Sequence, residues 1–313
     1  MLTKKVRRIQ SRLGIRHVTP ELVTLYLRKA AHQTLWGKRP ANPSILPIFG
    51  CQRSGTSLLT RVFFRDLNAK VYRETSALSS SDQESQRRKL RMNSLDEIKQ
   101  ILGRDRASLI VLKPLVESQR APEILRCFPN ARALWLYRHY KDVAASNLQA
   151  FGMDNGINDL RPIVRGESQN WRSEGTSAET REQVSKFFHE TMNPYDAAAL
   201  FWYARNRLFF ELALDTNERV RLCQYDDLVV RPSQVMQQIY QFAGQRYPGD
   251  RIVREVHAES VRKGQEVQLS VPVAELCEEI WQLLNQRYAS QVNGLAQVTT
   301  AASTNQLLAE LVQ

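Results

Sequence analysis

The feature that most constrains the fold is a glycine-rich loop directly behind a short apolar run. The run is Ile45–Phe49, and the loop that follows reads GCQRSGTS over residues 50–57. A buried strand, a glycine loop and a helix in this order form a phosphate cradle, because backbone N–H groups of the loop and of the helix N-terminus point at the anion. The sequence therefore predicts an α/β fold with an anion site at the carboxyl end of this strand.

The loop has the G-x-x-x-x-G spacing of nucleoside triphosphatases but departs from their pattern at one position. Thr56 stands where these proteins carry a lysine, and that lysine reaches the β- and γ-phosphates. Its replacement argues against hydrolysis of ATP or GTP. A different cation, Arg53, lies inside the loop, so we expect the loop to bind an anhydride shorter than a triphosphate.

The rest of the chain alternates between short apolar runs and amphipathic segments. Short runs that are apolar on both faces are typical of parallel strands covered by helices on both sides. The pattern predicts an α/β, P-loop-like three-layer fold with a central, mostly parallel sheet flanked by helices. The predicted strands are residues 45–49, 107–112, 131–137 and 220–225, and the predicted helices are residues 56–67, 119–127, 141–150, 195–215 and 232–244.

Two polar stretches interrupt this alternation. Residues 79–106 are mostly polar and charged, and we expect an exposed helix or a flap there. Residues 152–180 are rich in Gly, Asn, Asp and Ser, and we expect a long loop. Long loops are uncommon in compact domains unless they are functional, so this one is predicted to gate the substrate.

A second anion site is predicted beside the glycine loop. Arg138 follows the strand candidate 131–137, and Ser146 lies eight residues further on, in the next predicted helix. Ligands of parallel α/β sheets bind at the carboxyl ends of the strands, so both side chains are expected to face the same crevice as the loop. A guanidinium and a hydroxyl together suit a phosphate or a sulfate.

The net charge of +12 is concentrated near the N-terminus. Residues 1–43 contain ten Lys and Arg and one acid, Glu21, so they carry +9 and the rest of the chain carries +3. We interpret residues 1–43 as a basic N-terminal helical arm, in which Thr19 caps a helix that begins at Pro20. A main domain over residues 44–295 and a C-terminal linker with a short helix over residues 296–313 complete the predicted organisation.

Three interpretations of the basic arm stay open. It packs on the body with a solvated basic face, it contacts a membrane or another anionic surface peripherally, or it is an organelle transit peptide, since the first 20 residues are Arg-rich and lack acids. We expect no nucleic-acid partner. An apolar run of the roughly 20 residues that span a bilayer is absent from the sequence.

The cysteines and histidines indicate no metal site. The four cysteines are widely spaced, without a Cys-x-x-Cys pair, and the five histidines are scattered. We therefore expect reduced thiols, no structural zinc and a cytoplasmic protein.

Three segments together carry a family resemblance. They are PIFGCQRSGTSLL at residues 47–59, FPNARALWLYRHYKDVAASN at 128–147 and RVRLCQYDDLVVRPSQVMQQIYQFAG at 219–244. In this order they resemble the sulfotransferases that use 3′-phosphoadenosine 5′-phosphosulfate (PAPS). The tyrosylprotein and bacterial members, which have an arginine in the glycine loop, are most similar. The resemblance covers about residues 44–265.

The resemblance implies how this chain binds PAPS. The 3′-phosphate would lie on Arg138 and Ser146, and a C-terminal basic loop at residues 260–264 would add Arg262 and Lys263. Lys113 resembles the family lysine that contacts the sulfuryl group or the leaving oxygen. No metal is implied. The residues of the glycine loop that would bind the 5′-phosphosulfate are Arg53, Ser54, Gly55, Thr56 and Ser57.

The family reaction is in-line transfer of a sulfuryl group to a hydroxyl or an amine, which requires a general base. Glu74 lies 21 residues after Arg53, a position similar to that of the catalytic glutamate of tyrosylprotein sulfotransferases. Small-molecule sulfotransferases use a histidine two residues after the lysine, where this chain has Leu115. Glu117 is the second candidate. We predict Glu74, Lys113 and Arg53 as the catalytic residues.

Two other functional classes stay open at this point. One is a P-loop nucleotide hydrolase or kinase, which Thr56 disfavours, and the other is a non-catalytic, nucleotide-binding module that associates with membranes. The acceptor is not encoded in any single motif. A glycan, a lipid-linked glycan, a small metabolite and a peptide tyrosine are all compatible with the sequence.

Overall fold

The computed structural model describes residues 20–36, 40, 42–74, 76–79, 91–259 and 261–310, apart from the side chains of Trp36, Leu115 and residues 294–310. Its centre is a five-stranded sheet in the order β2-β3-β1-β4-β5, in which every neighbouring pair is parallel. The predicted parallel α/β sheet is therefore confirmed. The strands are β1 (Ser44–Gly50), β2 (Ala69–Tyr72), β3 (Leu109–Leu112), β4 (Ala133–Tyr137) and β5 (Val220–Gln224).

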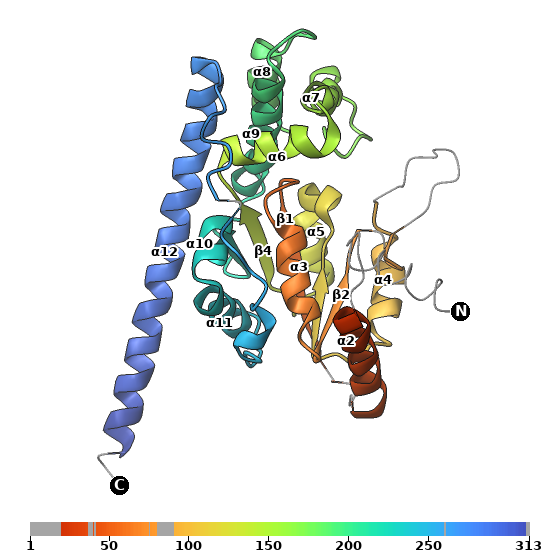
Figure 1. The fold of residues 1–313 in the computed structure, drawn as a ribbon, viewed down its shortest axis with the longest axis vertical. Coiled ribbons are helices and arrows are strands. Elements are labelled where there is room, and N and C mark those ends of the chain that lie inside the picture. Colours follow the sequence, from red (N-terminus) through yellow and green to blue (C-terminus); the bar gives the residue numbers. More distant parts are fainter. Residues whose placement is uncertain are drawn as a thin grey trace.

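Helices cover both faces of the sheet, because alternate residues of each strand point to opposite sides. On one side, Ile48 of β1 and Leu136 of β4 pack against α3 (Thr56–Phe64) and α11 (Pro232–Phe242). On the other side, Phe49 and Trp135 belong to a larger core. That core includes residues of α5 (Ala121–Cys127), α6 (Tyr140–Phe151), α9 (Pro194–Glu211) and α12 (Val271–Glu310). The three predicted layers follow from these two cores (Figure 1).

The predicted helices have counterparts close to their expected positions, and one strand was missed. The helices expected at residues 56–67, 119–127, 141–150, 195–215 and 232–244 correspond to α3, α5, α6, α9 and α11. Strand β2 lies at the edge of the sheet, and its four residues read AKVY, with only the first and last buried. Such a short, half-exposed strand lacks the apolar run on which the prediction relied.

The expectation of a long loop over residues 152–180 was wrong. The helix α7 (Asn155–Arg165) lies there, and the last three residues of the range begin α8 (Ala178–Phe187). The buried face of α7 includes Ile157, Leu160 and Ile163, and α7 packs against α9. Burial of these side chains outweighs the weak helix preference of the Asn, Gly, Asp and Pro residues around them.

The polar stretch 79–106 contains the helix α4 (Leu95–Leu102), which is partly buried through Ile98 and Leu102. Part of the expected flap lies outside the described residues. Four shorter segments complete the chain. They are the 3₁₀ turns η2 (Leu115–Arg120) and η3 (Asp250–Ile252), the helix α10 (Tyr225–Val230), and the π-helical turn η1 (His32–Trp36).

The N-terminal helix α2 (Pro20–Ala31) begins at the predicted Pro20, whereas Thr19 lies outside the described residues. A buried lysine helps to attach α2 to the body. The buried Nζ of Lys29 donates hydrogen bonds to the carbonyl oxygens of Phe64 at 2.7 Å and Asp66 at 2.6 Å. Both carbonyls lie at the end of α3, where an ammonium group also interacts favourably with the helix dipole.

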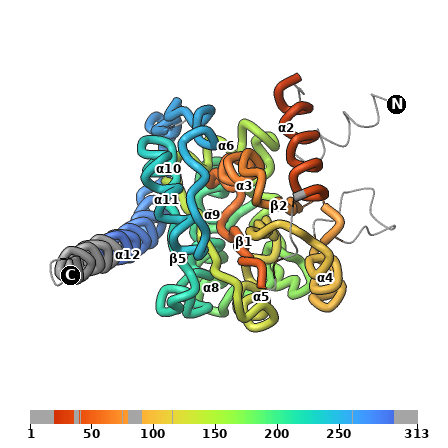
Figure 2. The backbone as a smooth tube through the Cα atoms, turned by 90° about the horizontal axis from the view of Figure 1, so that it is seen from below, coloured from red at the N-terminus to blue at the C-terminus, as the bar shows by residue number. Residues whose placement is uncertain are grey.

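The C-terminal helix α12 extends along the side of the molecule opposite to α2 (Figure 2). The residues predicted to form a C-terminal linker are helical, because α12 continues to Glu310. The separation into an arm, a main domain over residues 44–295 and a C-terminal segment stays a prediction. None of the helices in the described part of the chain is long and apolar enough to cross a membrane.

Candidate active site

Each of the five strands is followed, within two residues of its carboxyl end, by a residue of the candidate site. The glycine loop follows β1, Lys113 follows β3, Arg138 follows β4 and Tyr225 follows β5, while Glu74 lies two residues after β2. In a parallel sheet these ends lie along one edge, which is where ligands of such folds bind. The topology thus gathers residues that are far apart in the sequence.

The conformation of the glycine loop requires two residues with positive φ angles, Arg53 and Gly55. Gly55 has a φ of 98°, and a Cβ atom at this position would overlap the ring of Tyr225. Arg53 also has a positive φ, of 68°, which is uncommon for a residue with a side chain and is found at functional sites. The loop therefore depends on a glycine at position 55 and carries backbone strain at the arginine.

The N-terminus of α3 offers its N–H groups without competition from a side chain. Gly55 is the N-cap residue, and no side-chain hydrogen bond caps the helix. Next to it, the Oγ of the fully buried Ser54 has no hydrogen-bond partner among the described residues. Buried hydroxyls normally have a partner, so an unpaired one beside a helix N-terminus indicates a place for an anion.

Lys113, Glu74 and Ser57 meet at one point of the site. The Nζ of Lys113 donates a hydrogen bond to the Oγ of Ser57 at 2.8 Å and lies 2.6 Å from the Oε1 of Glu74. Burial lowers the pKa of Lys113, and the neighbouring Glu74 carboxylate opposes this effect. Lys113, which follows β3, therefore places an ammonium group at the loop, in which Thr56 replaces the usual lysine.

The two predicted anion sites are adjacent. The Nε of Arg53 donates a hydrogen bond to the Oγ of Ser146 at 3.1 Å, and its guanidinium lies 5.7 Å from the ring centre of Phe151. Burial, and secondly the positive charge of Arg138, lowers the pKa of Arg53. Two arginines that repel each other in one crevice require a counter-charge, which a bound anion would provide.

Arg138 is oriented by two contacts. Its Nη2 donates a hydrogen bond to the Oδ2 of Asp142 at 3.3 Å, and its guanidinium lies 4.5 Å from the ring centre of Tyr225. The same tyrosine packs on Gly55, so it contacts both predicted anion sites. Sequence reasoning missed this role of Tyr225, because only the fold brings the residue after β5 into contact with Gly55 in the loop after β1 and with Arg138 after β4.

The basic turn at residues 261–264 is attached to the start of α6. Asp142 accepts hydrogen bonds from the backbone N–H groups of Arg262, at 3.1 Å, and Gly264, at 2.6 Å. Lys263 lines the cavity, whereas Arg262 has its backbone at Asp142 and does not line the cavity. Sequence reasoning also missed Asp142, although an acid in the first turn of a predicted helix is a recognisable signal.

Most of the predicted site residues line one cavity of about 670 Å³. It contains five cations, Arg53, Arg61, Lys113, Arg138 and Lys263, and two carboxylates, those of Glu74 and Asp142. The cavity thus has an excess of three positive charges. Ser54 is fully buried and does not line the cavity. The predicted polar residues that also line it are Thr56, Ser57 and Ser146, together with Gly55.

Glu117, the second candidate base, is not placed to act on a substrate. It is fully buried and does not line the cavity. Its Oε1 lies 2.8 Å from the Nε of Arg91 and accepts a hydrogen bond from the N–H of Met92, and its Oε2 lies 3.4 Å from the Nη1 of Arg120. These contacts fit a structural ion pair, and they leave Glu74 as the glutamate that lines the cavity.

Within the described residues, no group of three or more His, Cys, Asp or Glu side chains is arranged to hold a metal ion. The lining also includes apolar and aromatic residues, among them Val116, Phe151 and Trp171. The cavity thus combines cationic, polar and apolar lining residues.

Comparison with known proteins gives one family. A family model described as "Sulfotransferase domain" matches residues 43–279. No curated protein matches the chain.

Several solved structures are similar at low identity. The sulfotransferase domain from the curacin biosynthetic pathway is 19% identical, with 79% of this chain and 99% of that chain covered and a TM-score of 0.45. Sulfotransferase STF9 from Mycobacterium avium is 13% identical, with 89% of both chains covered and a TM-score of 0.44. Mouse sulfotransferase SULT7A1, solved in complex with PAP, is 12% identical, with 75% of this chain and 71% of that chain covered and a TM-score of 0.35.

Proposed function

The chain belongs to the sulfotransferase domain family, and on this basis we propose that it transfers a sulfuryl group from PAPS to a hydroxyl or amine acceptor. The observation that carries the proposal is the cavity at the carboxyl edge of the sheet. It has an excess of three positive charges, and two sets of anion-binding groups lie side by side in it. PAPS carries a phosphosulfate and a separate 3′-phosphate, so its charges match this arrangement.

The residues present fit the two ends of this donor. The open N-terminus of α3 suits the phosphosulfate. Arg138 and Ser146 suit the 3′-phosphate, and Lys263 lines the same cavity. Tyr225 supports both halves, because it contacts Gly55 and Arg138.

The transfer breaks the bond between sulfur and the bridging oxygen of the donor, and it forms a bond between sulfur and the acceptor atom. Negative charge grows on the leaving oxygen and is best stabilised by fixed donors. Lys113 and Arg53 are suited to this task, since both line the cavity at the glycine loop. Glu74 would accept the proton that the acceptor loses, because it lines the cavity beside Lys113.

The acceptor is proposed by class alone. Phe151 and Trp171 give the cavity an aromatic wall, which suits an acceptor with an apolar or ring-shaped body, whether a small molecule, a glycan or a lipid-linked compound. A panel of alcohols, phenols and amines with labelled donor would identify the class.

The first test is a calorimetric titration with adenosine 3′,5′-bisphosphate, compared with ATP and GTP in the presence of Mg²⁺. We expect tight binding of the bisphosphate without metal. Arg138→Ala should abolish it, and Arg126→Ala, which changes an exposed arginine outside the cavity, should leave it intact. Preference for a magnesium triphosphate would overturn the proposal in favour of a nucleotide hydrolase or kinase. Bisphosphate binding without transfer to any acceptor would instead indicate a non-catalytic nucleotide-binding module.

A further inference from the structure

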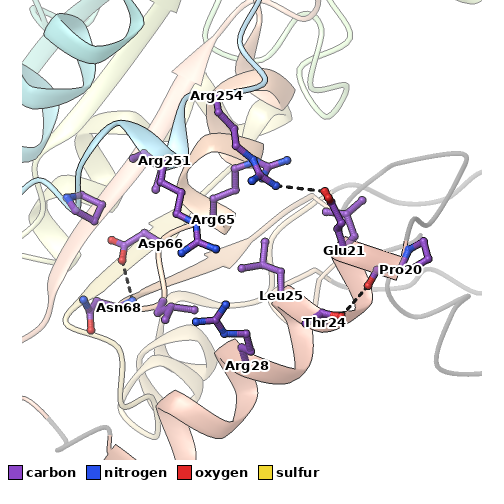
Figure 3. Close-up of a pocket in the computed structure, with 14 residues that line it drawn as sticks. Pro20, Glu21, Thr24, Leu25, Arg28, Arg65, Asp66, Asn68, Arg251 and Arg254 are labelled. Atoms are coloured by element: carbon purple, nitrogen blue, oxygen red, sulfur yellow. Dashed lines mark hydrogen bonds and ion pairs between the residues drawn. The ribbon is translucent and has the colours of Figure 1, made fainter.

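A second cavity lies at the opposite end of α3 from the glycine loop, and the proposed reaction does not use it. It is a groove of about 560 Å³ between α2, the turn Arg65–Asn68 behind α3, and residues 248–254 (Figure 3). The helix α3 has nine residues, which corresponds to a length of about 13 Å. The groove is therefore a site separate from the candidate active site.

Four arginines line the groove, and two of them have no ion-pair partner among the described residues. Arg65 is paired with Glu255, and Arg254 lies 3.2 Å from Glu21. Arg28 and Arg251 are exposed. Figure 3 shows these two side chains extending into the groove from opposite walls. Two guanidinium groups that converge in this way favour an anion between them.

The buried carboxylate of Asp66, which lines the groove, already accepts two hydrogen bonds. The Oδ2 of Asp66 accepts a hydrogen bond from the hydroxyl of Tyr240 at 2.8 Å, and its Oδ1 accepts one from the N–H of Asn68 at 2.9 Å. Asp66 is 4% exposed. It therefore stabilises the turn behind α3 and is not directed at Arg28 or Arg251.

Apolar residues line the groove together with the arginines, which favours a ligand that is more than a simple anion. They include Leu22 and Leu25 of α2, together with Leu67 and Ile252. An inorganic anion has no apolar part to contact these side chains. A ligand that carries a phosphate on an apolar body, as a phospholipid does, would use both the arginines and the leucines.

The N-terminal part of the chain has the same two properties. Leu27 of α2 is 53% exposed and Leu35, in the turn that continues α2, is 71% exposed. Residues 1–19, which precede α2, contain six Lys and Arg and no acid. A combination of basic residues and exposed leucines is typical of segments that bind anionic membranes.

We propose that the groove and the exposed side of α2 bind a membrane that contains anionic phospholipid. Arg28 and Arg251 hold the phosphate of one lipid in the groove, and Leu27 and Leu35 enter the interface between head groups and acyl chains. The active site, at the other end of α3, stays accessible to the donor while the protein is bound.

The test is co-sedimentation of the full chain with vesicles of phosphatidylcholine alone and with vesicles that also contain phosphatidylglycerol. We expect binding to the anionic vesicles only. Arg28→Gln/Arg251→Gln should weaken it by about 30-fold, since two basic residues at an anionic surface are lost. The control Arg165→Gln/Lys186→Gln removes two exposed positive charges from α7 and α8 and should leave binding within about twofold.

Three outcomes would overturn the proposal. An equal loss in both double variants, or in neither, would mean that the groove has no part in binding. Equal binding to neutral vesicles would mean that the arginines do not recognise the lipid phosphate. Binding of inorganic phosphate that needs Arg28 and Arg251, without binding to vesicles, would identify a free anion as the ligand. Titration with adenosine 3′,5′-bisphosphate separates two questions. Binding by the unchanged protein tests the proposed function, and equal binding by each variant shows that the variant is folded.

Discussion

At the scale of single residues, the contact between Glu74 and Lys113 is central to the proposed chemistry. Their side chains lie 2.6 Å apart inside the cavity, so a proton on Glu74 would remove most of its attraction to Lys113. Charge that develops on the leaving oxygen offers Lys113 a new partner at the same moment. We therefore expect proton uptake by Glu74 and departure of the leaving oxygen to be coupled through this lysine.

Replacement of the proposed base should separate turnover from binding. We expect Glu74→Gln to lower kcat by about 10² to 10⁴-fold, the usual range for a general base, with little change in affinity for adenosine 3′,5′-bisphosphate. Steady-state kinetics and calorimetry measure the two quantities. Glu97→Gln, in an exposed position of α4, is the control. Near-normal turnover in Glu74→Gln would rule out Glu74 as the base.

The lowered pKa of Lys113 predicts the alkaline limit of the reaction. Burial shifts this pKa below its ordinary value of 10.5, and the proposed reaction needs the protonated ammonium group. Activity should therefore be complete below the lowered pKa and be lost as the pH rises through it, at a lower pH than for an exposed lysine.

The variant Lys113→Arg tests this assignment, because arginine keeps its charge at all accessible pH values. We expect a reduced kcat and an alkaline limit that moves to higher pH. A profile of kcat against pH that keeps the wild-type limit in Lys113→Arg would show that another group titrates.

At the scale of elements, the site depends on the attachment of the 261–264 turn to α6. The buried carboxylate of Asp142 accepts hydrogen bonds from Arg138, Arg262 and Gly264. Space is tight there, because a Cβ on Gly264 would overlap the backbone of Lys141. One side chain thus links the arginine at the end of β4 to a segment more than 100 residues away in the sequence.

Asp142→Asn should loosen this turn without unfolding the protein. An amide has only one acceptor oxygen, so one or two of the three hydrogen bonds are lost, each worth about 1.5–3 kcal/mol when a charged group is involved. We expect faster hydrogen exchange at residues 261–267 and about tenfold weaker bisphosphate binding, with Glu218→Gln as the surface control. Unchanged exchange in the turn would contradict this link.

At the scale of the whole molecule, the first part of the helix α12 packs on the body. Its buried side chains include Cys277, Ile280 and Leu284, and its last described hydrogen bonds to the body are made by Gln291 to β5. The helix backbone continues to Glu310. We infer that the first part stabilises the fold.

A chain that ends at Asn293 should therefore keep its stability and its active site. We expect a change of less than about 1 kcal/mol in the free energy of unfolding, within the range of surface changes. The substitution Leu284→Ala should cost about 2–5 kcal/mol, because it opens a cavity in the core. Urea denaturation of both proteins measures the difference, and a large loss on truncation would show that residues after 293 stabilise the body.

The sequence alone was sufficient to predict the features that short segments of the chain encode. The glycine loop and its helix, the spacing of Arg138 and Ser146, and the apolar runs of four of the five strands are contained in short segments, because backbone geometry and burial on both faces depend on neighbouring residues. For the same reason Pro20 predicted the start of α2. These segments were enough for the α/β fold and for the family resemblance, which the family model then confirmed.

The tertiary structure decided what depends on contacts between distant segments. The edge strand β2 and the helix α7 form because their neighbours bury them, against weak local preferences. Glu74, Lys113 and Ser57 come from three elements, and their meeting follows from the strand order β2-β3-β1. Glu117 carried the same chemical signal as Glu74, but burial between Arg91 and Arg120 removes it from the cavity. A sequence specifies which groups are available, whereas only the packed fold determines which of them share one space.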